Sequence, residues 1–297
     1  MKTTSFARTF LILLLLATVP LAHGREILSE ASGVCRSDGS LVIAGDEETD
    51  TLWLVDDDQR QKVRTVKVAG GDWDDMEDLS AVDANRFFAL TSHSRTKKGK
   101  RRPEREQLML IAKKGSRFSV AHTWSLRKQI LATLEKSVGQ IVDMDNAEAA
   151  PPEEGGLNLE GILYLEGNVY LGLRSPLTKR GDAIVLKIEN GNGLLNGDAP
   201  VFGAVTTVPL NGNGIRGMSS HSKGVAMIAG PSDDSLRGFA LYQWAPGAKK
   251  AAELKLPGFE TLSRPEGVAA EKDGTFVFVQ DFEEASQQDV IVKLPRK

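Results

Sequence analysis

The sequence predicts an all-β protein that folds as a single β-propeller of about five four-stranded blades. Two observations support this prediction. One strand–turn–strand pattern recurs along the chain, and further apolar segments follow each copy. The length agrees, since 297 residues exceed an ordinary single domain but suit a propeller. Units of four antiparallel strands that repeat along a chain are typical of propeller blades.

The repeated pattern begins with a polar residue, usually followed by Gly, and continues as a strand of alternating polarity. A turn such as Asp-Gly or Gly-Asn follows, and then a second, more apolar strand. These pairs favour hairpins because primed turns need a positive φ. The five copies read SGVCRSDGSLVIAGDE from Ser32, EDLSAVDANRFFALTSHS from Glu77, EGILYLEGNVYLGLRSP from Glu160, RGMSSHSKGVAMIAGPS from Arg216 and EGVAAEKDGTFVFVQDF from Glu266.

Further apolar segments complete the predicted blades. Third strands are expected at Thr51–Val55, Gln107–Ala112, Ala183–Ile188, Phe239–Trp244 and Asp289–Leu294. Fourth strands are expected at Val63–Val68, Arg117–Thr123, Ala204–Leu210 and Ala251–Leu256. The fifth unit lacks its own fourth strand. We expect Arg25–Ser29 to pair there and close the ring, because closure removes an open sheet edge.

The interval between Glu77 and Glu160 is longer than the others and contains an apolar stripe at helical spacing. The stripe consists of Leu126, Ile130, Leu134, Val138 and Ile141. We therefore predict one inserted helix after the second blade, at about 125–143, with Ser125 as its N-cap. Residues 147–156 are expected to be a linker into the third blade. A sixth, degenerate blade is the alternative interpretation of this interval.

The N-terminal segment predicts export. Lys2 and Arg8 flank the start of an apolar segment, Leu11–Ala17, and Ala22-His23-Gly24 offers small residues for cleavage. We expect residues 1–24 to be a signal peptide and 25–297 to be the mature propeller domain, either periplasmic or secreted. An uncleaved membrane anchor is the alternative, although Pro20 interrupts the apolar run. No other stretch is long and apolar enough to cross a membrane.

The charge of the chain limits its partners. The formal net charge is −3, and it becomes −5 when residues 1–24 are removed. This balance argues against nucleic acid or an anionic membrane as the main partner. Cys35 is the single cysteine, so no intrachain disulfide can form. We expect a monomer whose ligand is a small or anionic molecule.

Three segments resemble a bacterial family of exported propellers catalogued as domain of unknown function 3616. They are FFALTSHS (87–94), LNLEGILYLEGNVYLGLRSPLTKRGDAIVLKI (157–188) and IRGMSSHSKGVAMIAGPSDD (215–234). This resemblance implies a propeller and assigns no activity. The EG-containing repeats also resemble, more loosely, exported esterase-like phytases and gluconolactonase-type propellers. The latter resemblance implies a divalent metal in the central channel, with Glu160 and Glu266 in the matching EG dipeptides.

Antiparallel geometry predicts one polar rim. The start of each first strand and the end of each second strand must lie on the same side of the ring. The residues expected there are Glu77, Glu160, Arg216 and Glu266, beside Asp46, Ser92, His93, Arg174, Ser175 and Asp281. Polar residues that converge on one mouth of a propeller indicate a ligand site.

Three interpretations of this rim remain open. The glutamates can be structural ties to arginines or to the backbone of a neighbouring blade. Alternatively, Glu77, Glu160 and Glu266 bind Ca²⁺ or Mg²⁺, because hard oxygen ligands suit these ions. In the third interpretation Arg174 and Arg216 bind an anionic or sugar-like ligand. Ser92, Ser175 and Asp281 then complete the predicted ligand-binding set.

Two functional classes follow from these interpretations. One is a binding propeller, and the other is a metal-assisted hydrolase of an ester, lactone or phosphoester. His93 is the candidate acid–base residue of the second class. The basic run from Arg95 to Arg105 is either a solvated loop or an electrostatic lip that draws anionic molecules toward the mouth.

Overall fold

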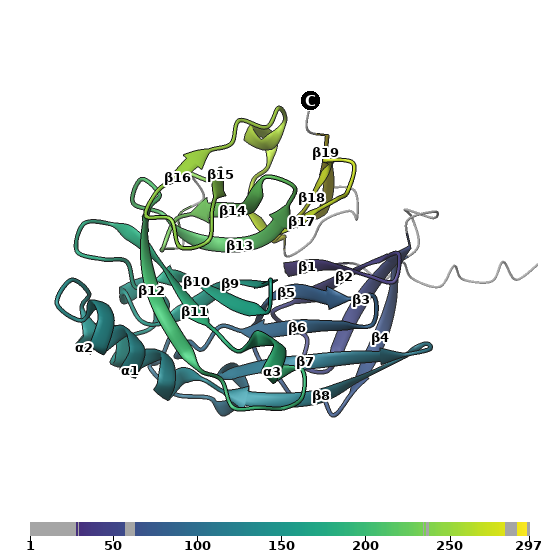
Figure 1. Ribbon diagram of the computed structural model, residues 1–297, viewed down its shortest axis with the longest axis horizontal. Coiled ribbons are helices and arrows are strands. Elements are labelled where there is room, and N and C mark those ends of the chain that lie inside the picture. Colours follow the sequence, from purple (N-terminus) through teal and green to yellow (C-terminus); the bar gives the residue numbers. More distant parts are fainter. Residues whose placement is uncertain are drawn as a thin grey trace, which may run out of the picture.

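The protein is a five-bladed β-propeller, which confirms the predicted fold. The computed structural model describes residues 28, 30–56, 63–233, 235, 238–282 and 290–295. The chain passes once around the molecule, from the purple first blade through teal and green to the yellow last blade beside it (Figure 1). In each blade the strands are antiparallel and follow their order along the chain.

The strands lie close to the predicted segments. The first blade contains β1 (Ala31–Ser37), β2 (Ser40–Gly45), β3 (Thr51–Asp56) and β4 (Val63–Ala69), and the second contains β5 (Met76–Asp83), β6 (Arg86–Thr91), β7 (Gln107–Lys114) and β8 (Arg117–Ser125). The third contains β9 (Asn158–Leu165), β10 (Asn168–Ser175), β11 (Asp182–Ile188) and β12 (Phe202–Pro209). The fourth contains β13 (Gly214–His221), β14 (Gly224–Gly230), β15 (Ala240–Trp244) and β16 (Ala251–Glu253), and the fifth contains β17 (Pro265–Ala270), β18 (Phe276–Gln280) and β19 (Ile291–Leu294).

The first two blades are joined at their outer strands. Val68 pairs with Phe118 and Ala69 with Ser119, in parallel register, so that β4 and β8 connect the two sheets into one of eight strands. This pairing satisfies backbone groups that would otherwise lie on two exposed edges.

The hydrophobic core lies between the blades. The inner strands β1, β5, β9, β13 and β17 contact one another in a closed ring. An apolar cluster fills each of the five junctions between neighbouring blades. Val34 and Trp53 of the first blade, for example, share a cluster with Val277 and Val279 of the fifth. Cys35 is buried at the junction of the first and second blades, as a small apolar residue.

The insertion after the second blade contains two helices instead of the single one predicted. These are α1 (Arg127–Val138) and α2 (Met144–Ala149). Ile130, Leu134 and Val138 of the predicted stripe pack into the cluster between the second and third blades, and α1 contacts β12. The sixth-blade alternative is therefore wrong. The remaining short helices of the described residues are η2 (Pro103–Arg105), η3 (Pro152–Glu154), α3 (Gly191–Leu194) and η4 (Phe259–Thr261).

The predicted boundaries of the insertion need correction. Ser125 does not cap a helix, because it still pairs with Gln107 in the sheet, and Leu126 stands at the N-cap position without a side-chain bond. The second helix begins after Asp143, whose side chain accepts a hydrogen bond from Asn146 N. The expected linker from 147 therefore begins inside α2.

The predicted signal peptide and most of the predicted closing strand, Arg25–Ser29, lie outside the described residues and stay predictions. Leu28 is described and is fully buried in the cluster that contains Val277 and Val279. Glu30 N donates a hydrogen bond of 2.9 Å to Phe282 O. These contacts connect the beginning of the first blade to the fifth. Among the described residues, no helix has the length and apolar character needed to cross a membrane.

Candidate ligand-binding site

A β-bulge recurs at the same place in all five inner strands. The polar residue that begins each repeat has no partner in the neighbouring strand, although the residues on both sides of it are paired. These bulged residues are Ser32, Glu77, Glu160, Arg216 and Glu266. Because a bulge re-aims a side chain out of the regular alternation, five polar side chains are directed to one rim.

The glycine that follows the bulge allows the blades to approach closely at the axis. A Cβ atom on Gly33 would lie 2.5 Å from Asp78 Cα, and one on Gly217 would lie 2.4 Å from Glu266 O. Backbone atoms cannot move aside as a flexible side chain can. The Gly of the repeat is therefore required at these positions by packing between blades.

The second blade has Asp78 where the others have this glycine. The Asp78 carboxylate is fully buried and accepts hydrogen bonds from Leu79 N at 2.8 Å, from Ile162 N at 2.9 Å and from Met218 N at 3.4 Å. Burial raises the pKa of Asp78 well above its usual range, although these backbone bonds oppose the shift. Since the three nitrogens belong to the second, third and fourth blades, Asp78 links three blades near the axis.

The bulged residues line a cavity of about 670 Å³. Asp46, Arg174 and Asp281 line it too, as expected from the shared rim of the inner hairpins. Charged side chains of both signs form most of its wall, and Pro152 is the only apolar residue among the described residues that line it. The site is therefore suited to a strongly polar molecule.

Glutamates and arginines of the third, fourth and fifth blades are paired in the floor of this cavity. Arg216 Nε lies 2.7 Å from Glu266 Oε2 and 2.8 Å from Glu160 Oε2, and Arg216 Nη2 also contacts Glu266. Arg174 Nη1 donates a hydrogen bond of 3.0 Å to Glu160 Oε1. Burial alone would lower the pKa of Arg216, but Glu160 and Glu266 outweigh it and raise this pKa. These contacts match the interpretation of Glu160 and Glu266 as structural ties.

The three glutamates predicted to bind Ca²⁺ or Mg²⁺ are not arranged as a cation site. Arg216 already brings positive charge to Glu160 and Glu266. Glu77 is half-buried and has no ion-pair partner among the described residues. Throughout the described part of the chain, no three His, Cys, Asp or Glu side chains are placed to hold a metal ion. The donor set at Glu160 and Glu266 therefore does not fit either ion.

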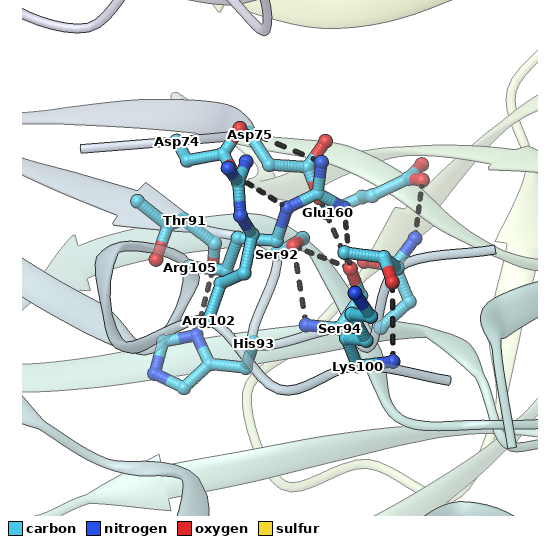
Figure 2. Close-up of polar contacts among 12 residues, drawn as sticks. Asp74, Asp75, Thr91, Ser92, His93, Ser94, Lys100, Arg102, Arg105 and Glu160 are labelled. Carbon is cyan, nitrogen blue, oxygen red and sulfur yellow. Dashed lines mark hydrogen bonds and ion pairs between the residues drawn. The ribbon is translucent and has the colours of Figure 1, made fainter. Parts of the chain in front are cut away.

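His93 lies beside the site but its ring does not line the cavity. Its Nδ1 is 2.7 Å from Thr91 O, and Figure 2 shows the ring turned away from Asp75 and Arg105. The side chain is fully buried, and burial lowers its pKa to about 4, so the ring is neutral at neutral pH. The backbone at His93 has a φ of 58°. The geometry gives no support to His93 as an acid–base residue acting in the cavity.

Ser92 and Ser175 are buried behind the cavity wall. Ser92 Oγ donates a hydrogen bond of 2.9 Å to Ser94 Oγ, which in turn lies 3.0 Å from Asp75 Oδ2. Ser175 Oγ donates to Gly156 O. These two serines hold the loops that form the wall. Ser94, which the sequence-based site did not include, lines the cavity itself.

The basic segment 95–105, here called the basic lip, is anchored over the cavity. Arg105 Nε is 2.9 Å from Asp74 Oδ2, and its Nη1 is 3.0 Å from Asp75 Oδ2 (Figure 2). Arg95 Nε donates to Glu148 O at the end of α2. These contacts fix the lip, so the segment is more than a solvated loop.

The lysines of the lip differ from its arginines. Lys97, Lys98 and Lys100 are exposed and line the cavity, and no ion-pair partner for them exists among the described residues. The arginines of the lip therefore fix its conformation, whereas its lysines leave positive charge at the cavity mouth.

Sequence reasoning missed several lining residues that share one position in the repeat. Glu30, Asp75, Asn158 and Arg264 each precede a bulged residue by two positions, and all four line the cavity. Asn158 Nδ2 donates to Glu160 Oε1 at 2.9 Å, and Arg264 Nη2 lies 2.6 Å from Asp281 Oδ2. The repeat alignment contains this signal, because the position two before the bulge carries a polar or charged residue in four of the five repeats.

The fold and the cavity together define the class: a β-propeller with a charged cavity at one mouth of its ring. More specifically, the chain belongs to the family described as "Protein of unknown function (DUF3616)", which matches residues 45–268. The sequence matches no curated protein.

Solved structures align with most of this chain at low sequence identity. A glucose dehydrogenase aligns with a TM-score of 0.51 and 13% identity, covering 91% of this chain and 97% of that chain. Glutaminyl cyclase from Myxococcus xanthus aligns with a TM-score of 0.49 and 10% identity over 90% of each chain. The PQQ-bound aldose sugar dehydrogenase of Streptomyces coelicolor has a TM-score of 0.47 and 13% identity, covering 90% of this chain and 94% of that chain. At these identities the similarity concerns the fold alone.

Proposed function

We propose that the protein binds a small anionic ligand in the cavity at the mouth of the propeller. The observation that carries this proposal is a set of three lysines, Lys97, Lys98 and Lys100, on the lip of a cavity lined almost entirely by polar and charged residues. None of the three is paired with a described carboxylate. Unpaired cations at the entrance of a concave site raise the local concentration of anions. Carboxylate and phosphate groups accept charge-assisted hydrogen bonds from such side chains.

The wall of the cavity also limits the ligand class. Among the described residues that line it there is no aromatic side chain on which a sugar ring or a base could stack. Arg174 and Asp281 line the cavity and belong to the proposed site, whereas Ser92 and Ser175 support it from behind. Arg216 is held by two glutamates, so we assign it a positioning role in the floor.

The alternative, a metal-assisted hydrolase of an ester, lactone or phosphoester, has less support. Such an enzyme would use carboxylates free to hold the metal and a group able to move a proton in the site. Glu160 and Glu266 instead face Arg216, and the His93 ring is buried outside the cavity. Export of the protein stays a prediction from the N-terminal sequence.

The lip lysines provide the test. The substitutions Lys97→Gln, Lys98→Gln and Lys100→Gln are combined in one variant. Lys223→Gln, Lys249→Gln and Lys250→Gln form the control variant, which loses the same amount of positive charge. These three lysines are exposed and lie beyond the strand ends opposite the cavity. The probes are inorganic phosphate, citrate and gluconate, first by thermal shift and then by calorimetry.

We expect the unmodified protein to bind at least one probe. At about 10 mM salt the lip variant should bind that probe roughly tenfold more weakly than the unmodified protein does. At high salt the two proteins should bind it with nearly equal affinity, because screening shortens the range of the lip charges. The control should bind as the unmodified protein does. Binding of none of the probes, or equal weakening in both variants, would overturn the proposal.

A further inference from the structure

Most of the carboxylates that line the cavity come from three neighbouring blades. The carboxylates Glu30, Asp46, Glu47, Asp75, Glu77 and Asp281 come from the first, second and fifth blades. Arg174 and Arg216 come from the third and fourth blades, where Glu160 also lines the cavity, and Arg264 comes from the fifth. The basic lip comes from the second blade, between β6 and β7. A molecule in this cavity would therefore meet a group of carboxylates around Asp46 and Glu77, and positive charge at Arg174 and at the basic lip.

Several of these carboxylates form no ion pair with a described residue. Asp75 is paired with Arg105, and Asp281 with Arg264. Asp46, Glu47 and Glu77 have no ion-pair partner among the described residues. Asp46 Oδ1 is also completely buried and accepts no hydrogen bond from a described residue. A buried, unsatisfied acceptor in a cavity wall is costly unless a ligand supplies the donor.

The protonation of these groups reflects their burial and the carboxylates beside them. Burial, and then Glu30, Asp75 and Asp281, raise the pKa of Asp46 to about 8. Burial, followed by Glu160, Asp75 and Asp46, raises the pKa of Glu77 well above its usual range. The arginines beside these carboxylates, Arg105 and Arg264, are already engaged by Asp75 and Asp281. An added cation would favour ionisation of Asp46 and Glu77.

We propose that the ligand is dipolar, with a primary ammonium group beside Asp46 and Glu77 and a carboxylate or phosphate toward Arg174 and the basic lip. The anionic end rests on the function proposed above, and the cationic end is the new element. An ammonium fits better than a metal ion, because it donates three hydrogen bonds without a strict coordination geometry. No carboxylate set among the described residues has the arrangement that a metal would need.

The test uses matched probes that differ in one charged end. Glycine, alanine and their di- and tripeptides with free termini are compared with the N-acetylated and C-amidated counterparts by calorimetry. We expect at least one free-ended probe to bind at least tenfold more tightly than either blocked form. Its affinity should rise from about pH 6 to pH 7, where the free amine is still protonated, with release of a proton at neutral pH because Asp46 ionises against the ammonium.

Asp46→Asn should reduce the proton release and the preference for a free amine. Asp38→Asn is the matched control, since Asp38 lies at the turn of the same β1–β2 hairpin, away from the cavity. Circular dichroism checks that both variants fold, and Glu77→Gln replaces Asp46→Asn if the latter does not. Unchanged proton release and amine preference in the folded cavity variant would overturn the assignment of the ammonium site.

The remaining outcomes separate the two proposals. If N-acetylated probes bind as tightly as free ones, and the lip variant weakens both, the cationic half is wrong and the anionic site stands. If C-amidated probes bind as tightly as free ones, the anionic half and the function proposed above both fail. The proposal of a dipolar ligand is also overturned if no peptide probe binds. Binding of Ca²⁺ alone that Asp46→Asn abolishes would overturn it too.

Discussion

Arg216 is the residue at which the third, fourth and fifth blades converge. Its guanidinium contacts Glu160 and Glu266, its Nη1 donates to Pro231 O at 3.3 Å, and its Cζ lies 5.8 Å from the centre of the Phe239 ring. A buried charge is tolerated only when its donors are satisfied. Arginine suits this place because its planar fork presents several donors at once.

Removal of the Glu160 charge should destabilise the protein. Glu160 is 2% exposed and compensates both Arg174 and Arg216. We expect Glu160→Gln to lower the free energy of unfolding by about 1–3 kcal/mol, because it weakens charge-assisted bonds and leaves the arginines less neutralised. Urea denaturation measures the change. Glu154→Gln, at an exposed position outside the cavity, is the control, and equal stability of the two variants would contradict the role of Glu160 as a tie.

The sequence predicted which residues share the rim but not which of them touch. Repeat alignment and antiparallel geometry suffice to place Glu77, Glu160 and Glu266 at one mouth, because that placement depends only on the course of the backbone. The pairing of Arg216 with two glutamates depends on the bulge and on packing between blades. Neither can be predicted from the residue type at one position of the sequence. The direction of the His93 ring likewise depends on its positive φ, which is rare for a residue other than Gly.

At the scale of the element, the recurring bulge explains why one short pattern produces both the fold and the site. The bulged position directs a polar side chain to the rim, and the next position brings backbones of two blades into contact. The polar–Gly pair of the repeat therefore combines a ligand-facing residue with a packing requirement.

The glycine after the bulge can be tested in β1. A Cβ atom on Gly33 would overlap the Asp78 backbone, so we expect Gly33→Ala to cost about 1–3 kcal/mol or more through overpacking. Gly39→Asn is the control at the turn of the same hairpin. Gly39 has a φ of 79°, which Asn tolerates, and a Cβ atom there would have no neighbour within 4 Å. Thermal and urea unfolding report the difference. A Gly33→Ala variant as stable as the control would show that the blades can separate there at little cost.

The helical insertion shows where periodicity alone misleads. The apolar stripe predicted one helix through Ile141, but α1 ends at Val138 and Ile141 is 44% exposed. The short α2 has no stability of its own at six residues, since isolated helices of that length do not form in water. Arg127 and Arg95 both donate to Glu148 O at its end, so tertiary contacts support it. Such contacts leave no periodic trace in the sequence.

At the scale of the whole molecule, stability depends on closing the ring. Each blade buries its apolar faces against two neighbours, so an open ring would expose the cluster between the fifth and first blades. The number of blades was predictable because each unit repeats the same polar–turn–apolar order. The closing contacts were predictable only in outline, since they join residues from the two ends of the chain.

Leu28 provides the test of closure. It precedes the first blade in sequence, is fully buried, and shares a cluster with Val277, Val279 and Val290 of the last. We expect Leu28→Ala to lower the free energy of unfolding by about 2–5 kcal/mol, as for other buried leucines whose loss leaves a cavity. Val201→Ala is the control, because Val201 is 53% exposed and should change stability by less than about 0.5 kcal/mol.

The shape of the unfolding transition adds a second readout. If the junction between the last and first blades is needed by the whole ring, Leu28→Ala should still unfold in one transition, shifted to lower urea, with tryptophan fluorescence and circular dichroism coinciding. Trp53, in the closing cluster, and Trp244, at the junction of the third and fourth blades, then report the same event from opposite parts of the ring. An early, separate loss of the fluorescence signal, with the circular dichroism midpoint unchanged, would mean that the ring tolerates an open junction and that its blades are held pair by pair.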